Sequence, residues 1–201
     1  MAAIPFHLFA DQLSQLAAAI DALCLILGER LAANMETPPA AALAALQAGD
    51  IAAQRVNHVA EAFAVLAGLP IPVDPELYGP GCRLQALQLR AATTDFCNGL
   101  AALTQITGLS ADGQAIVARD GQAIVTRLET ICVGLEASAD KTTLGAGEDP
   151  AQRARLIDVL RPRYTMAAEH AILAGFLVGG LEPDAAEPSA ETDDDLEGAF
   201  L

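Results

Sequence analysis

Two polar residues four positions apart, Asp50 and Gln54, are the first candidates in this sequence for chemistry on a bound partner. They lie in the apolar-rich stretch 43–66, whose residues separate into two faces at the 100° per residue of an α-helix. Residues four apart lie one turn apart, so this carboxylate and this carboxamide can reach the same external group. The same polar face carries four candidate partner-binding residues, namely Gln47, Asn57, His58 and Glu61. A face that is only solvated gives the same pattern, and this alternative stays open.

The elements that must position these residues are helices. Apolar residues recur three and four apart in the ranges 6–35, 43–66, 82–107, 110–137, 151–160 and 165–177, whereas alternating β-branched runs are missing from the sequence. We therefore predict an all-α bundle of about six helices. The proline-rich stretch 70–81 predicts a long connection. Ser110 or Asp112 is expected to cap the fourth helix, Pro162 to interrupt the fifth, and Thr165 to cap the last.

The composition divides the chain into a helical body, residues 1–180, and a disordered acidic tail, residues 181–201. The tail holds eight acidic residues and no basic one, so a formal charge of −15 for the chain leaves −15 + 8 = −7 for the body. Its tip, DDDLEGAFL, places Leu196, Phe200 and Leu201 at a spacing that suits one face of a short helix. We interpret the tip as a docking peptide for a protein partner. A frayed tail with stray hydrophobic residues is the alternative.

Charge and cysteine usage narrow the function classes. An acidic body with an acidic tail repels nucleic acid and anionic membranes. The longest uncharged apolar run near the end, residues 171–181, is too short to span a bilayer. The four cysteines are scattered among apolar residues and the three histidines are isolated, so we expect neither a disulfide framework nor a metal site. These features suit a cytoplasmic protein with a protein partner.

The segment Asp50-Ile-Ala-Ala-Gln54 resembles the DxxxQ motif of the CheZ family of chemotaxis phosphatases, including diverged members of the CheT type. The family is also helical and acidic, and it ends in a linker and an amphipathic peptide that binds the response regulator. The resemblance implies that Gln54 orients a water for attack on the aspartyl phosphate of a receiver domain, and that Asp50 pairs with the receiver's lysine. It implies no cofactor in this chain, since the magnesium belongs to the regulator, and it implies a homodimer.

Several features leave other interpretations open. A second DxxxQ match occurs at Asp11 and Gln15, and the family's motif lies past the middle of the chain in a single long hairpin. A non-catalytic helical adaptor that binds signalling proteins explains the helices, the charge and the tail equally well. A histidine phosphotransfer domain that uses an exposed His58 is a further alternative. A basic cluster near Pro162 could bind an acidic partner or the chain's own tail; it consists of Arg153, Arg155, Arg161 and Arg163.

Overall fold

A computed structural model describes residues 6–68, 75–106, 109–142 and 150–178 of the chain. Within these ranges every regular element is a helix, which confirms the predicted all-α class. The long helices are α1 (Phe6–Asn34), α2 (Ala40–Gly68) and α3 (Pro75–Thr104). A fourth rod is built from α4 (Ala111–Ile116), the π-helical turn η1 (Val117–Gly121) and α5 (Gln122–Thr142). The 3₁₀ turn η2 (Arg161–Arg163) separates α6 (Pro150–Leu160) from α7 (Ala167–Val178).

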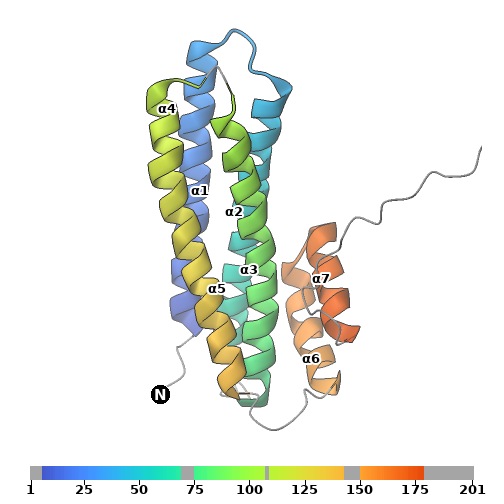
Figure 1. Cartoon of the computed structure of the whole chain (residues 1–201). Helices are drawn as coiled ribbons and strands as arrows, with labels where there is room; N and C mark the ends of the chain where they lie inside the picture. The colour runs from blue at the N-terminus through green and yellow to red at the C-terminus, as the bar shows by residue number, and fades with distance from the viewer. Residues whose placement is uncertain (1–5, 69–74, 107–108, 143–149, 179–201) are drawn as a thin grey trace, which may run out of the picture.

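The four long rods form an elongated up-and-down bundle, in which consecutive helices are neighbours and α1 also contacts α5 (Figure 1). Apolar side chains at spacings of three and four close the interior, among them Leu13, Leu16 and Ile20 of α1, which have no exposed surface. The two aromatic residues near the start of α1, Phe6 and Phe9, lie 5.4 and 5.3 Å from the ring of Phe63 in α2. This apolar interior supplies the main stabilisation of the bundle.

Small residues allow close approach between neighbouring helices of the bundle. A Cβ added at Gly49 of α2 would lie 2.3 Å from the Cys24 sulfur of α1. A Cβ added at Gly99 of α3 would lie 2.9 Å from the carbonyl oxygen of Ala45 in α2. The helices α1, α2 and α3 are therefore fixed at short distances beside the segment that carries Asp50, which makes α2 a rigid support for its polar face.

The start of α3 differs from the sequence prediction. The stretch 70–81 was expected to be a connection, but α3 already begins at Pro75 and contains Pro80. Proline at the first helical position loses no intrahelical hydrogen bond, whereas Pro80, in the second turn, removes one. Burial of Gly79, Pro80 and Cys82 against the bundle offsets that loss.

The α6–α7 pair forms a short hairpin that packs on the outside of the bundle, against α3 and, through η2, against α2 (Figure 1). The interruption at Pro162 is as predicted, since η2 occupies residues 161–163. Among the described residues no helix is both long enough and apolar enough to cross a membrane. All four cysteines are free, and Cys24, Cys82 and Cys132 are buried.

Candidate functional site

Asp50 and Gln54 lie in the middle of α2 with both side chains exposed. The helix forms here because Pro39 begins its first turn, where its carbonyl accepts from Ala42, and an alanine-rich sequence continues it without a break. Neither side chain makes a hydrogen bond or an ion pair with any described residue. The pair is therefore presented outward one turn apart, as the spacing predicts.

The surroundings of Asp50 are acidic. Asp21 of α1 lies near it, and partial burial together with the Asp50 charge raises the pKa of Asp21. The same two carboxylates and, above all, burial raise the pKa of the Cys24 thiol to about 11, so this thiol is protonated at neutral pH. A site with two neighbouring carboxylates and no paired cation attracts a positive group from outside.

The other predicted polar-face residues divide into two groups. Gln47 and Glu61 are exposed, like Asp50 and Gln54. Asn57 is half-buried, and its Nδ2 donates to Glu61 Oε1 of the next turn at 3.0 Å. His58 was expected to be exposed, but its side chain is only 17% exposed because α7 packs over it. The exposed part of the polar face thus consists of Gln47, Asp50 and Gln54, with Glu61 further along the helix.

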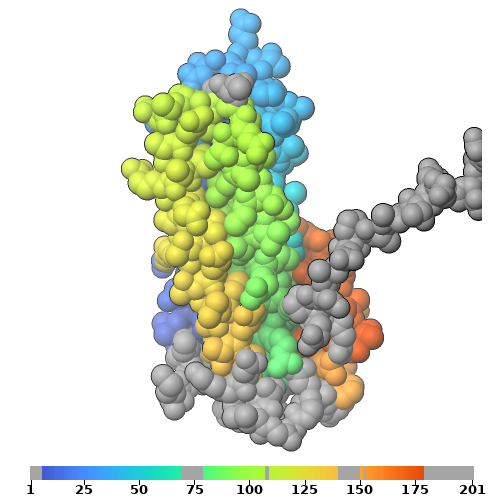
Figure 2. Space-filling model, in the orientation of Figure 1, coloured from blue at the N-terminus to red at the C-terminus, as the bar shows by residue number. Residues whose placement is uncertain are grey.

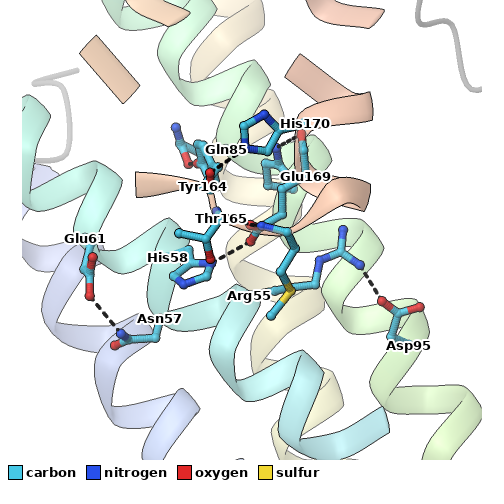
Figure 3. Close-up of polar contacts among 12 residues, drawn as sticks. Arg55, Asn57, His58, Glu61, Gln85, Asp95, Tyr164, Thr165, Glu169 and His170 are labelled. Atoms are coloured by element: carbon cyan, nitrogen blue, oxygen red, sulfur yellow. Dashed lines mark hydrogen bonds and ion pairs between the residues drawn. The ribbon is translucent and has the colours of Figure 1, made fainter. Parts of the chain in front are cut away.

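His58 contacts a buried carboxylate that the sequence analysis missed. Its Nδ1 lies 2.8 Å from Oε1 of Glu169, whose side chain is 1% exposed (Figure 3). The second oxygen, Oε2, accepts the backbone N–H groups of Thr165 and Met166 at 3.0 and 2.9 Å. Glu169 therefore caps α7 and joins it to α2. Thr165 was predicted to cap this helix with its side chain, but the capping group is the carboxylate at the third helical position.

Two glutamines of α3 complete this polar interface. Gln88 Nε2 donates to the backbone oxygen of Glu169 at 3.0 Å, and the buried Tyr164 hydroxyl donates to Gln85 Oε1 (Figure 3). The remaining amide atoms, Gln85 Nε2 and Gln88 Oε1, are buried and have no hydrogen-bond partner among the described residues. Burial, which outweighs the hydrogen bond to Gln85, raises the pKa of Tyr164. The hairpin therefore adds polar contacts to the burial of its apolar residues Leu156, Ile157 and Leu160, and no periodicity of apolar residues could reveal those polar contacts.

Arg55 is a second buried charge that the sequence analysis passed over. Its side chain is 5% exposed and its Nη1 donates to Asp95 of α3, whose side chain is 41% exposed (Figure 3). Arg55 follows Gln54 directly, but it lies on the flank of α2 that faces α3. The pair fixes α2 against α3 and leaves the Asp95 side open to water.

A cavity of about 440 Å³ opens between α3 and α5, on the face that Figure 2 presents. Its lining residues are Arg90, Thr93, Thr94, Cys97, Glu129, Cys132 and Val133. None of them belongs to α2, so the cavity is separate from Asp50 and Gln54. Burial raises the pKa of Cys132 to about 11 and also raises that of Cys97, which leaves no thiolate nucleophile at neutral pH. Arg90 is already bound to Glu136.

The described residues contain no group of histidine, cysteine and carboxylate side chains that could hold a metal ion. The predicted docking residues Leu196, Phe200 and Leu201 lie outside the described residues, as does the rest of the tail. Comparisons of the chain with models of protein families, with curated proteins and with solved structures give no match.

Proposed function

We propose that this chain acts in chemotaxis or two-component signalling as a CheZ-like phosphatase on the receiver domain of a response regulator. The observation that supports the proposal is the outward presentation of Asp50 and Gln54, one turn apart and unpaired among the described residues, on a helix held rigidly by its neighbours. The proposed partner would place the chain in the cytoplasm.

The proposed chemistry needs positioning rather than a strong base. Hydrolysis of an acyl phosphate passes through a loose transition state, so a water held in line with the phosphorus supplies much of the catalysis. The neutral carboxamide of Gln54 can hold that water without repelling the phosphoryl group. Asp50, with Asp21 beside it, would attract the receiver's lysine. The magnesium ion would be the receiver's own.

The face around the pair also suits docking. Leu43 and Ile51 of α2 are 52% and 44% exposed. They flank the free polar residues along the same helix and offer apolar contact area to a partner. A non-catalytic adaptor would use the same surface, so the decisive measurement is the rate of dephosphorylation.

The test is loss of phosphate from purified, phosphorylated receiver domains of the same genome. The wild-type chain should accelerate it, and Gln54→Ala should remove most of the acceleration, about 10²- to 10³-fold, while complex formation persists. Asp50→Ala should weaken both binding and rate. Gln15→Ala is the matched control, because Asp11 and Gln15 are equally exposed on α1 and should contribute nothing.

Two outcomes would reject the catalytic proposal. If no cognate receiver loses phosphate faster with the wild-type chain, but one binds it, the adaptor function holds. If Gln54→Ala matches the wild type, the motif is a coincidence. We do not propose phosphotransfer through His58, because its Nδ1 is engaged by the Glu169 carboxylate and its side chain is only 17% exposed.

A further inference from the structure

The α6–η2 segment carries a basic surface on an otherwise acidic body, and Asp158 is the one carboxylate between positions 153 and 163. Four of the eleven basic residues of the chain lie between positions 153 and 163. Elsewhere in the described part, Arg30, Arg55, Arg90 and Arg119 each pair with a carboxylate. Arg127 of α5 is a single exposed arginine that forms no ion pair with a described residue. Three arginines of this segment are exposed and form no ion pair with a described residue: Arg155, Arg161 and Arg163. We call these three side chains the basic surface.

The last described helix, α7, ends beside the first turn of α6. Arg153, in the first turn of α6, donates through Nη1 to the backbone oxygen of Phe176 near the end of α7, at 3.4 Å. The chain therefore leaves α7 beside the start of α6. From there the basic surface extends over about 15 Å of helix, at about 1.5 Å per residue. The 21 residues of the tail could span up to about 70 Å, so its acidic groups can reach all three arginines.

We propose that the chain's own acidic tail, residues 181–201, docks on the basic surface of α6 and η2. Eight negative charges and no positive one face three unpaired guanidinium groups, and the covalent link gives the tail an effective concentration in the millimolar range. Each exposed ion pair contributes little by itself, so the contact is reversible and sensitive to salt. This inference is independent of the proposed phosphatase activity.

Docking of the acidic tail would also restrict the tip of the tail, DDDLEGAFL. A tail that is held on α6 keeps Leu196, Phe200 and Leu201 close to the body, where a partner must displace the acidic segment before it binds the tip. The device would disfavour weak, non-cognate partners, because each must offset the same intramolecular contact.

The test uses the full chain, labelled with ¹⁵N, at 20 mM and 300 mM salt. At low salt the amide resonances of the tail and the side-chain Nε–H resonances of Arg155, Arg161 and Arg163 should differ from those at high salt. Arg161→Glu should move the tail amides by more than half of the way to their positions in a free peptide of residues 181–201. Arg127→Glu, the same change at an exposed arginine of α5, is the matched control and should leave them in place.

A second pair of variants tests the tail side without touching the bundle. Replacement of Asp193, Asp194 and Asp195 by lysine should release the tail, and combination with glutamate at the three arginines should restore the contact. The proposal fails if the tail of the wild-type chain already matches the free peptide at 20 mM salt. It also fails if the shifts disappear on dilution from 500 to 10 μM, because the occupant is then the tail of a second copy.

Discussion

At the scale of single residues, the carboxylates of Asp21 and Asp50 repel each other across the α1–α2 surface. We predict that Asp50→Asn lowers the pKa of Asp21 toward its ordinary value, because the variant removes the neighbouring charge. Burial of Asp21 remains, so the decrease should be partial. A titration of the Asp21 side-chain carboxyl by ¹³C NMR measures the change, with Asp11→Asn as a distant control. An unchanged pKa in Asp50→Asn would contradict the proximity of the two groups.

The raised pKa also predicts how stability depends on pH. The folded chain holds the Asp21 proton more tightly than the unfolded chain, so the free energy of unfolding falls as pH rises from the unfolded pKa through the folded one. Asp21→Asn removes this pH-dependent decrease in the free energy of unfolding, because asparagine does not titrate. The variant should therefore melt slightly above the wild type at pH 7, and the advantage should vanish below the ordinary aspartate pKa. Thermal unfolding at pH 7 and pH 3 checks the sign.

Glu169 should contribute more than Glu61 to the free energy of unfolding. Its carboxylate accepts two backbone N–H groups and contacts His58 in a buried site. Glu169→Ala should lower the free energy of unfolding by about 2–4 kcal/mol, since a helix cap and a charge-assisted hydrogen bond are lost together. Denaturant unfolding measures it. Glu61→Ala, which removes an exposed carboxylate bound only to Asn57, should change it by less than about 0.5 kcal/mol.

At the scale of elements, the spacing of apolar residues in the sequence correctly predicted the helices and their buried faces. The positions of α1, α2 and α6 and the burial of Val56 and Phe63 follow from spacings of three and four. The prediction was wrong at Pro75–Gly81, where local proline chemistry favours a loop but burial against the bundle sustains a helix. It also missed η1, because a π-helical turn leaves no signature in the apolar spacing; Gly121, at the end of this turn, packs closely against Leu100.

In the candidate site, too, some features follow from the helical periodicity of the sequence and others do not. The exposure of Asp50 and Gln54 follows from the helical wheel of α2 alone. The contact between His58 and Glu169 joins residues 111 positions apart, and only the folding of α6 and α7 back onto the bundle brings them together. The same holds for Gln85 and Tyr164. Long-range polar contacts of this kind have no period, so the sequence analysis had no signal from which to find them.

The close contact between α2 and α3 gives a prediction about two glycines. Gly99→Ala should lower the melting temperature, because its Cβ would lie 2.9 Å from a backbone oxygen of α2 and the helices must separate. Gly134→Ala is the matched change in α5, where no described heavy atom outside its own turn lies within 4 Å. It should raise the free energy of unfolding by about 0.5–1 kcal/mol through helix propensity. Destabilisation by both variants, or by neither, would contradict this packing.

At the scale of the whole molecule, a bundle with an apolar interior carries a hairpin that is docked through both apolar and polar side chains. The interior of the bundle is closed by fully buried leucines and phenylalanines. The hairpin buries Leu156, Ile157 and Leu160 in the same core, but its interface also contains Glu169, Gln85 and Gln88. Two amide atoms of these glutamines have no hydrogen-bond partner in the described part of the chain, and a buried unsatisfied polar atom costs about 1–3 kcal/mol. The stability of the molecule is therefore uneven, and the hairpin is its weaker part.

We therefore predict that α6 and α7 open together, as one unit, before the bundle unfolds. Native-state hydrogen exchange should give the amides of α6–α7 a lower opening free energy than those of α1 and α2. Two variants distinguish separate opening of the hairpin from cooperative unfolding of the whole chain. Tyr164→Phe leaves Gln85 Oε1 without its donor, so it should lower the opening free energy of both units. Ile20→Val, in the bundle interior, should lower only that of the bundle, by about 0.5–1.5 kcal/mol, because the opened hairpin state retains the same defect. Equal opening free energies in the hairpin and the bundle, changed in parallel by both variants, would show that the chain unfolds as a single cooperative unit.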